Sequence, residues 1–454
     1  MSAREKERQM LSKKIFGVIS LGCDKNRVDS EKLLGLIKEK GCRLTDDLSK
    51  AQIVIVNTCG FLQSAREEAI ETILECADYK SGNLEKLVVT GCLPQKFIDE
   101  LYLPLEEADV FLGINDYEKL FESLEKSYAE GERQNYVGKG ADGYIQSRVL
   151  TTPDHFAYLK IADGCYNHCT YCLIPKIRGK YRSYPMEALL KEAEELGDTA
   201  ELIVVAQDTT RYGEDLYGKN SFVELLQRLS ALENIHSIRL LYCYPDVITD
   251  ELIEEIASNP KILKYMDIPL QHSENRVLKL MNRKGTRDGY LALFKKLRER
   301  IPGIAIRSTF ISGFPTETEE EFKGMLTFVK EAKLNNCGFF AYSREPDTGA
   351  YRLKPQVHAA TKKRRVRILY EAQAAVSAEI LSGFVGKEIE VVCDGIDYEK
   401  GCFIGRAYFS APDIDGKVYF NAGEAMQGQR YLVKIHRADC YDLYGYTEDY
   451  EGEI

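Results

Sequence analysis

The sequence predicts a multidomain α/β protein with three folded parts. They are an N-terminal doubly wound parallel sheet, a central partial (β/α)6 barrel and a small C-terminal antiparallel β-barrel. Two successive series of short apolar runs alternate with amphipathic stretches, as strands and covering helices do. The last seventy or so residues carry only short strand patterns and turn signals. A chain of 454 residues is also too long for one hydrophobic core.

The first series, in residues 13–130, predicts the N-terminal domain. Its apolar runs are IFGVIS, IVIVNT, LVVT and VFLG. The amphipathic stretches that follow these runs are 29–40, 62–79, 94–102 and 117–129. This alternation predicts a parallel sheet covered by helices. Residues 131–152 are polar and contain glycine, which predicts a linker.

The second series, in residues 153–358, predicts six strand-helix units. Its apolar runs are FAYLKIA, LIVVAQ, SIRLLYC, KYMDIPL, IAIRSTFI and CGFFAYS. The helical stretches between them are 186–197, 221–232, 248–258, 287–299 and 318–333. Right-handed crossovers curl such a series towards closure, so we expect an incomplete barrel. A bridging helix over 359–382 should then lead to the β-barrel of residues 383–454.

The composition is that of a globular protein rather than a secreted or membrane protein. Hydrophobic residues make up 44% and charged residues 29%. No apolar run approaches the ~20 residues of a membrane span, and the N-terminal MSAREKERQM is charged where a signal peptide turns apolar. The expected compartment is therefore the cytoplasm, and no membrane partner is expected. In that compartment thirteen cysteines favour metal or redox chemistry over disulfides.

The net charge of -10 argues against nucleic-acid binding driven by overall electrostatics. A local basic face remains possible, and the run KKRRVR at 362–367 is the candidate. We interpret this run as a solvated helix face or an interdomain contact in preference to an RNA site.

The strongest chemical signal is a CxxxCxxC motif directly after a predicted strand, in ADGCYNHCTYCLIPKIRG. Its cysteines, Cys165, Cys169 and Cys172, can bind three irons of a 4Fe-4S cube and leave the fourth iron open. The amine and carboxylate of a small molecule, such as the methionyl part of S-adenosylmethionine (SAM), could chelate that iron. One alternative is a zinc site with His168 as fourth ligand, and another is a group of buried free cysteines.

Three further cysteines, Cys23, Cys59 and Cys92, each follow one of the first three N-terminal strands. Because the ends of parallel strands lie on one edge of a sheet, these thiols should come together as a second cluster site. The alternative is that they are ordinary buried cysteines of α/β loops. The other seven cysteines share no site and are interpreted as structural: Cys42, Cys76, Cys243, Cys337, Cys393, Cys402 and Cys440.

With the aromatic Tyr171 before its last cysteine, the central motif resembles the radical SAM signature. The two triads and the domain order resemble the methylthiotransferase family of radical SAM enzymes over essentially the full chain, and the terminal module resembles the TRAM domain. The resemblance implies two 4Fe-4S clusters. The central cluster would generate a 5'-deoxyadenosyl radical, and the N-terminal cluster would carry the sulfur that is methylated and inserted.

The resemblance also implies that Tyr171, Gln207, Arg307 and Gly313 contact SAM, with Phe314 and Pro315 following in SGFPTET. The residues alone leave another reading open, in which Arg307 pairs with a core carboxylate and Gly313 and Pro315 shape a turn. No catalytic side chain is assigned beyond the cluster ligands.

Within the family, the sequence is similar to the branch that modifies an aspartate of ribosomal protein S twelve. The likeness lies in SLGCDKNRVDSE, NTCGFLQSAREEA, AYLKIADGC, VVAQDTTRYGEDLYG and CYDLYGY. Asp24, Arg27 and Tyr444 depart from that pattern. Residues 383–454 hold seven Lys or Arg against fourteen Asp or Glu, Asp413, Asp415 and Glu424 among them. An acidic module suits a basic ribosomal protein better than tRNA.

The implied reaction adds a methylthio group to the aspartate β-carbon, whose unactivated C-H bond requires a radical. One SAM would donate the methyl group and a second would be the radical source, with a reductant and a sulfur donor as further partners. The substrate would be ribosomal protein S twelve, free or in the small ribosomal subunit. The alternatives are a tRNA adenosine methylthiotransferase and, outside this class, a non-catalytic iron-sulfur protein that binds the ribosome or RNA.

Overall fold

The computed structural model describes residues 11–140 and 143–450. The charged N-terminal segment, from which the absence of a signal peptide was predicted, lies outside the described residues, as do the last four residues of the chain. Within the described ranges, no helix is both long enough and apolar enough to cross a membrane.

The chain divides into two compact units. The first contains the chain up to Thr151, together with Asp163–Tyr166 and Cys172–Tyr184. The second contains Thr152–Ala162, Asn167–Tyr171 and the rest of the chain from Pro185.

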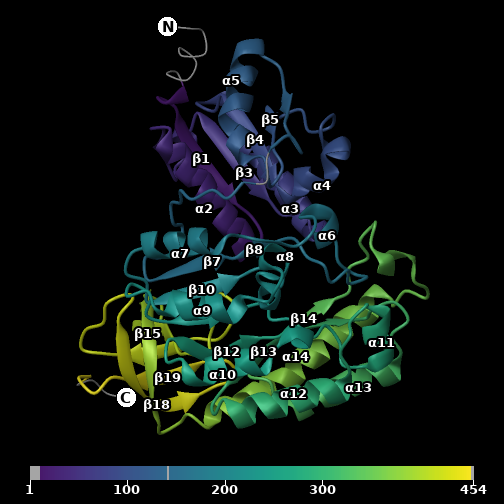
Figure 1. The fold of residues 1–454 in the computed structure, drawn as a ribbon, viewed down its shortest axis with the longest axis vertical. Coiled ribbons are helices and arrows are strands. Elements are labelled where there is room, and N and C mark those ends of the chain that lie inside the picture. The colour runs from purple at the N-terminus through teal and green to yellow at the C-terminus, as the bar shows by residue number, and fades with distance from the viewer. Residues whose placement is uncertain (1–10, 141–142, 451–454) are drawn as a thin grey trace. The chain divides into compact units, whose positions relative to one another are not determined.

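The first unit is built on a six-stranded, wholly parallel sheet with the order β2-β1-β3-β4-β5-β6 (Figure 1). Its strands are β1 (Ile15–Ser20), β2 (Arg43–Leu44), β3 (Ile53–Thr58), β4 (Lys86–Gly91), β5 (Val110–Phe111) and β6 (Gln134–Asn135). Its helices are α2 (Asp24–Glu39), α3 (Gln63–Ala77), α4 (Cys92–Leu101), α5 (Leu120–Glu130) and the short α6 (Ile174–Ile177). The chain adds β2 on one side of β1 and β3 to β6 on the other, so the strand order reverses direction at β1. Sheets of this kind bind ligands at that point, outside the carboxyl ends of the strands.

Helices cover both faces of this sheet, because successive residues of a buried parallel strand point to opposite faces. Ile55 of β3 packs in one core with Leu33 of α2 and Leu124 of α5. Val54 packs in the other core with Ile73 of α3 and Leu93 of α4. The doubly wound N-terminal sheet that the sequence predicts is thus confirmed.

Described parts of the segment 131–152, predicted as a linker, pack within the first unit. The segment supplies the sixth strand, β6. Further along, the carboxylate of Glu31 in α2, which is fully buried, accepts hydrogen bonds from Arg148 Nε and from the backbone N–H of Thr151, both at 2.8 Å. Glycine is required at position 35 of the same helix, since a Cβ there would lie 2.5 Å from the backbone of Ser147.

The second unit contains a six-stranded parallel sheet with the order β14-β13-β12-β11-β10-β7. Its strands are β7 (Phe156–Lys160), β10 (Glu201–Val205), β11 (Ile238–Leu240), β12 (Ile262–Asp267), β13 (Ala305–Ser312) and β14 (Asn336–Ala341). Its helices are α7 (Met186–Glu195), α8 (Glu214–Tyr217), α9 (Phe222–Ser230), α10 (Asp250–Ser258), α11 (Asn275–Leu280), α12 (Arg287–Arg300) and α13 (Glu319–Ala332). The first and last strands stay on the two edges of the sheet, which confirms an incomplete barrel of six strands. Two short strands, β8 (Ala162–Asp163) and β9 (Arg182–Ser183), pair separately at the two ends of the cysteine loop. Of these, Asp163 and β9 belong to the first unit.

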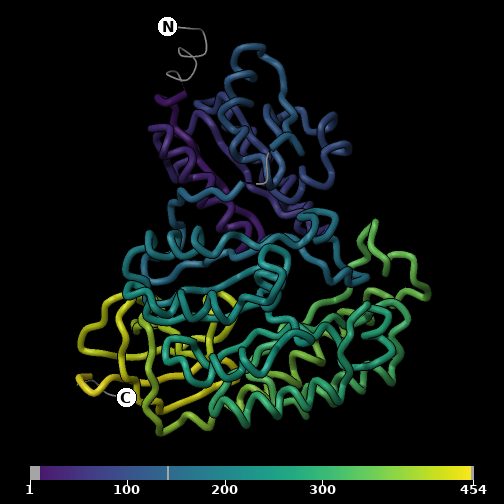
Figure 2. The backbone as a smooth tube through the Cα atoms, in the orientation of Figure 1, coloured from purple at the N-terminus to yellow at the C-terminus, as the bar shows by residue number. Residues whose placement is uncertain are grey.

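The long helix α14 (Ala359–Ser382) continues into a closed five-stranded β-barrel, as the chain trace shows (Figure 2). The barrel strands are β15 (Glu388–Asp397), β16 (Cys402–Arg406), β17 (Val418–Asn421), β18 (Arg430–Ala438) and β19 (Leu443–Tyr446). The sequence predicts a fully antiparallel barrel, but one of its strand pairs is parallel. Strand β17 pairs with β19 in parallel, because β18 lies between them in the sequence but beyond β19 in the barrel.

Candidate functional site

The three N-terminal cysteines all lie at the carboxyl edge of the first unit's sheet. Cys23 follows β1 and is the N-cap of α2, and Cys92 is the first residue of α4 after β4. Cys59 follows β3 directly. The positive end of a helix dipole favours a thiolate, so two of the three positions are electrostatically suited to metal ligands.

Glycines let the three loops that carry these cysteines approach closely. A Cβ at Gly22 would lie 2.9 Å from Cys59 Cβ, and a Cβ at Gly60 would lie 2.8 Å from the backbone of Cys92. Gly22 also has a φ of +94°, a conformation that favours glycine. The structure therefore brings Cys23, Cys59 and Cys92 together, as the sequence predicts from strand order alone.

Burial shifts the pKa of two of the three thiols, those of Cys59 and Cys92. It raises the pKa of Cys92 to about 12 and also raises that of Cys59. The neighbouring thiols of Cys23 and Cys59 add to the shift at Cys92. Metal binding at this site must therefore displace protons, as thiolate ligands require.

Among residues 11–140 and 143–450, no three Cys, His, Asp or Glu side chains are grouped to hold one metal ion.

The central cysteine loop is firmly anchored within the second unit by its middle residues. The backbone N–H of Thr170 donates to Met281 O at 3.1 Å, and Thr170 O accepts from the backbone N–H of Ala350 at 2.7 Å. The side chain of Asn282 donates to the carbonyl oxygens of Asn167 and His168. These contacts fix the backbone on both sides of the bend at His168, whose φ is +47°.

The two outer cysteines of this loop belong to the first unit. Gly164 has a φ of +72°, and a Cβ there would lie 2.1 Å from Lys180 O, so only glycine fits before Cys165. The backbone N–H of Cys165 donates to Gly179 O at 3.3 Å. Cys172 Sγ accepts a hydrogen bond from the backbone N–H of Ile174 at 3.4 Å. Backbone donors of this kind stabilise a ligating thiolate.

In each triad one cysteine sulfur is contacted by a buried arginine, and neither arginine was predicted from the sequence. Arg178 Nη2 lies 3.5 Å from Cys92 Sγ in the first unit. Arg283 Nη1 lies 3.8 Å from Cys169 Sγ in the second unit, with its guanidinium 4.0 Å above the ring of Tyr244. A cation beside a thiolate favours the charged form, so each arginine suits a cluster ligand as its neighbour.

Several predicted SAM contacts meet at one apolar cluster. The ring of Tyr171 packs against an apolar cluster that includes the buried Phe314 and Met281. Gly313, beside Phe314, has a φ of +74°, and a Cβ there would lie 2.4 Å from Lys362 Cγ. Gly313 therefore needs to be glycine for its turn, which is the alternative interpretation of its role. Its neighbour Phe314 belongs to the cluster against which Tyr171 packs.

Gln207 follows β10 at the carboxyl edge of the second sheet. Its amide oxygen Oε1 is buried and has no hydrogen-bond partner among the described residues. A buried acceptor without a partner is costly, so a ligand that donates a hydrogen bond would be stabilised at this position. The side chain thus fits its predicted contact with SAM.

Arg307 on β13 is bound by two carboxylates. Its Nη1 lies 3.2 Å from Asp267 Oδ1, and its Nε lies 3.3 Å from Asp415 Oδ1. Asp415 belongs to the C-terminal barrel and also accepts a hydrogen bond from Tyr265 Oη at 2.7 Å. The structure thus has the pairing with core carboxylates that the residues left open as an alternative, and a SAM contact by Arg307 stays a prediction.

The same contact corrects the expectation that Asp415 lies on the acidic surface of the barrel. Its side chain is only 1% exposed, and burial raises its pKa. Asp413 and Glu424, which were predicted with it, are exposed. The reason is that the loop before β17 turns Asp415 inward, towards the arginine on β13.

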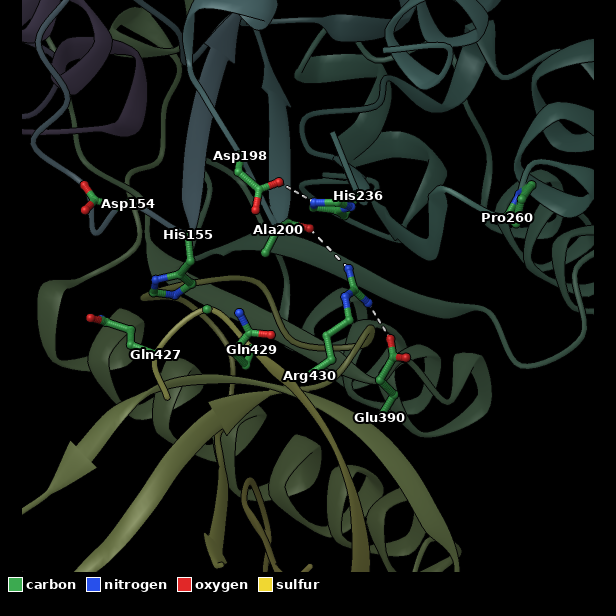
Figure 3. Close-up of a pocket in the computed structure, with 11 residues that line it drawn as sticks. Asp154, His155, Asp198, Ala200, His236, Pro260, Glu390, Gln427, Gln429 and Arg430 are labelled. Carbon is green, nitrogen blue, oxygen red and sulfur yellow. Dashed lines mark hydrogen bonds and ion pairs between the residues drawn. The ribbon is translucent and has the colours of Figure 1, made fainter. Parts of the chain in front are cut away.

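A pocket opens at the opposite edge of the second sheet (Figure 3). Residues that precede β7, β10 and β11 line it, with residues of the barrel, and they include His155, Asp198, His236, Glu390 and Arg430. Asp198 pairs with His236, and Glu390 pairs with Arg430. Because the cysteine loop follows the other end of β7, this pocket is not part of the cluster site.

Sequence reasoning missed the residues that support the cysteines and the SGFPTET loop, above all Arg178, Arg283, Glu317 and Arg365. Two of them had a local signal. Arg178 lies in the same IPKIRG segment as the end of the triad, and Glu317 follows Gly313 in the loop itself. Arg365 had no signal of its own, since it lies in the basic run that is interpreted as a solvated helix face or an interdomain contact.

Three family models match the chain. The Radical SAM superfamily matches residues 159–329, Uncharacterized protein family UPF0004 matches 15–113, and the TRAM domain matches 385–447. Along the chain, UPF0004 corresponds to the N-terminal parallel sheet, the Radical SAM superfamily to the partial barrel and the TRAM domain to the closed β-barrel.

Curated relatives match almost the whole chain. A ribosomal protein uS12 methylthiotransferase RimO from Clostridium tetani is 45% identical over 438 residues, which cover 96% of this chain and 98% of the relative. The protein of the same name from Lachnoclostridium phytofermentans is 46% identical over 442 residues, which cover 96% and 100%.

Among solved structures, the radical S-adenosylmethionine methyltransferase TsrM from Kitasatospora setae, with cobalamin and a [4Fe-4S] cluster bound, matches with a TM-score of 0.54. The match covers 74% of each chain at 14% identity. At that identity the likeness speaks for the fold alone.

Proposed function

We propose that this chain, which belongs to the RimO family of ribosomal protein uS12 methylthiotransferases, attaches the methylthio group to the β-carbon of an aspartate of that protein. Family membership makes it a radical SAM enzyme with an iron-sulfur cluster and SAM as cofactors. The observation that carries the proposal is the convergence of Cys23, Cys59 and Cys92 at one sheet edge, in a chain that also has the central CxxxCxxC loop.

Two 4Fe-4S clusters belong to the proposal. Cys165, Cys169 and Cys172 would hold the cluster that cleaves SAM, and Cys23, Cys59 and Cys92 would hold the second. Support for these assignments comes from the helix N-termini at Cys23 and Cys92 and from the arginines at Cys92 and Cys169. When bound, the clusters and SAM would supply a 5'-deoxyadenosyl radical and a methylated sulfur.

The chain's own residues bind and orient the reactants in this proposal. Tyr171 and Phe314 form an apolar wall that excludes water, and Gln207 Oε1 accepts a hydrogen bond from SAM. Gly313 and its turn hold Phe314 in place. No side chain acts as nucleophile or general base, because the hydrogen is removed by a radical.

The proposal includes the division of labour among domains. Residues 13–130 would form the domain of the second cluster, with 131–152 leading to the radical SAM domain of residues 153–358. The helix over 359–382 would then join that domain to a substrate-binding module of residues 383–454. A ribosomal substrate places the enzyme in the cytoplasm, where a reductant and a sulfur donor complete the reaction. tRNA is the competing substrate.

The experiment that tests catalysis is anaerobic reconstitution with iron and sulfide, followed by incubation with SAM and a reductant. We expect 5'-deoxyadenosine, detected by liquid chromatography and mass spectrometry. A non-catalytic iron-sulfur protein would hold the clusters and leave SAM intact. A reduced, iron-loaded protein that forms no 5'-deoxyadenosine would therefore refute the enzyme assignment.

A further inference from the structure

Arg178 is a buried cation with acceptors on several sides. Its side chain is 1% exposed and follows the short helix α6. Nη1 donates to both carboxylate oxygens of Asp163, at 3.1 and 2.9 Å. Nη2 donates to Asn26 Oδ1 at 2.7 Å and Asp29 Oδ2 at 3.0 Å, and it lies 3.5 Å from Cys92 Sγ. These partners all belong to the first unit.

The partners of Arg178 come from two separate parts of the proposed chemistry. Asp163 lies two residues before Cys165, and Arg178 itself lies six residues after Cys172, so their ion pair closes the base of the central cysteine loop. Asn26 and Asp29 lie in α2, which begins at Cys23, and Cys92 begins α4. One guanidinium thus joins the base of that loop to the site of the N-terminal cysteines.

The charges around Arg178 explain why it can be buried and what it does there. A buried arginine needs compensating carboxylates, and Asp29 and Asp163 provide them. The planar fork of the guanidinium can reach all of these acceptors at once, which a lysine ammonium cannot. Beside Asp163, Asp29 and Asn26, the fourth partner of Arg178 is the sulfur of Cys92. A hydrogen bond and a positive charge at a cluster thiolate stabilise the more negative, reduced state and so raise the reduction potential.

We propose that Arg178 is a positioning residue that fixes the base of the Cys165–Cys172 loop to the N-terminal cysteine site and raises the reduction potential of the cluster held by Cys23, Cys59 and Cys92. The inference rests on the proposed function, since that cluster is part of it. Arg178 then makes two contributions that can be tested separately. Its positive charge raises the reduction potential, and the geometry of its hydrogen bonds positions the loop.

The charge is tested by a redox titration of the reconstituted full-length protein, followed by electron paramagnetic resonance. The signals are assigned with two control proteins, each of which lacks one cysteine triad. Arg178→Gln should lower the potential of the N-terminal cluster, and the nearly isosteric Asp29→Asn should raise it. The expected size of each shift is about 59 mV, which corresponds to a tenfold change in a one-electron equilibrium. A purely structural role would not give shifts of opposite sign.

The geometry is tested with Arg178→Lys, which keeps the charge but loses the fork. The potential should stay near that of the parent protein. The yield of methylthio product per 5'-deoxyadenosine should fall by roughly tenfold or more, because small displacements of reacting groups are costly. Arg133→Lys is the matched control, since Arg133 lies in the same unit and bonds the backbone of Ala108 and Leu105, without contact to a cysteine. It should change neither the potential nor the yield.

The outcomes separate this inference from the function on which it rests. If the parent protein holds both clusters and neither Arg178→Gln nor Asp29→Asn shifts the potential, or both shift it in the same direction, the inference is wrong and the function stands. If Arg178→Gln fails to bind iron, Asp29→Asn alone decides the question. A parent protein without iron at the N-terminal triad would overturn both.

Discussion

Arg365 of α14 donates a hydrogen bond of 2.6 Å from Nη1 to Oε1 of Glu317, and both side chains are buried. The other carboxylate oxygen of Glu317 accepts from the backbone N–H of Gly313 at 2.8 Å. Lys362, one turn earlier on α14, donates from Nζ to Tyr342 O and covers Gly313. Part of the basic run KKRRVR is therefore an internal contact of the SGFPTET loop, as one reading of the sequence expected.

Arg365→Gln should weaken SAM binding. The substitution removes the cation that compensates the buried carboxylate of Glu317, and this carboxylate holds the backbone of Gly313. We expect the dissociation constant for SAM, measured by equilibrium dialysis on the reconstituted protein, to rise by roughly tenfold. Arg367→Gln removes the same charge from the same run, but Arg367 is 75% exposed and pairs with exposed Glu371, so the constant should stay unchanged. Equal effects of the two substitutions would contradict the assignment. A loss of RNA binding in Arg367→Gln would instead support an RNA contact.

The two cysteine triads should be separable. Replacing Cys165, Cys169 and Cys172 by Ala should leave about half of the iron and abolish SAM cleavage. Replacing Cys23, Cys59 and Cys92 should preserve 5'-deoxyadenosine formation and stop sulfur transfer. Iron analysis and product chromatography check both results, and replacement of the exterior Cys402 is the control. Loss of all iron in either triple variant would show that the sites are not independent.

The acidic C-terminal barrel should contribute to recruitment of a basic protein. Reversing the exposed Asp413, Glu424 and Glu448 to Lys should slow modification of uS12 most at low salt, where screening is weakest. Buried Asp415 is left out, since its reversal would break the contact with Arg307. Reversing three exposed carboxylates of α3, Glu68, Glu71 and Glu75, applies the same charge change elsewhere and is the control. A salt-independent effect, or faster modification of tRNA by the barrel variant, would count against this role.

Glu201 of β10 should make the second unit sensitive to acid. Although burial opposes ionisation, the guanidinium groups of Arg239 and Arg406 lower its pKa to about 2. A lowered folded-state pKa gives stability that is present above the unfolded value of 4.5 and is lost as the pH falls from there towards 2. Arg406 lies on the barrel strand β16, so this pair also holds the barrel to the sheet.

The measurement is urea unfolding of Glu201→Gln and the parent chain at several pH values. At pH 7 the substitution should cost about 3–5 kcal/mol, because it leaves two buried cations without their carboxylate. The difference should shrink below pH 4.5. Glu187→Gln, at an exposed pair with Arg228, should leave the unfolding curve nearly unchanged. A difference that does not change with pH would contradict the assignment of the stabilising charge to Glu201.

The periodicity of the sequence was enough to predict most elements, because apolar residues repeat with the pattern that buried strands and helices require. The stretch 287–299 became α12, Arg287–Arg300, and the stretch 186–197 became α7, Met186–Glu195. Strand order also predicted the convergence of Cys23, Cys59 and Cys92, since parallel strands end at one edge. These inferences needed only local patterns and one topological rule.

What the sequence could not supply were contacts between distant residues. Nothing near Asp415 indicates that it pairs with Arg307, and nothing near Arg365 indicates that it binds Glu317. The parallel pairing of β17 with β19 likewise depends on how the barrel closes. Charge patterns in a sequence give the number of ionic groups, whereas burial in the fold decides which of them face solvent.

The most direct test of the proposed function is to present the reconstituted enzyme, with SAM and a reductant, to purified uS12 and, separately, to unmodified tRNA. Mass spectrometry of the protein's peptides and of the tRNA nucleosides then reports where a methylthio group has been added. We expect a methylthio group on one aspartate of uS12 and unchanged tRNA. A methylthioadenosine in the tRNA with every aspartate of uS12 unmodified would contradict the proposed function.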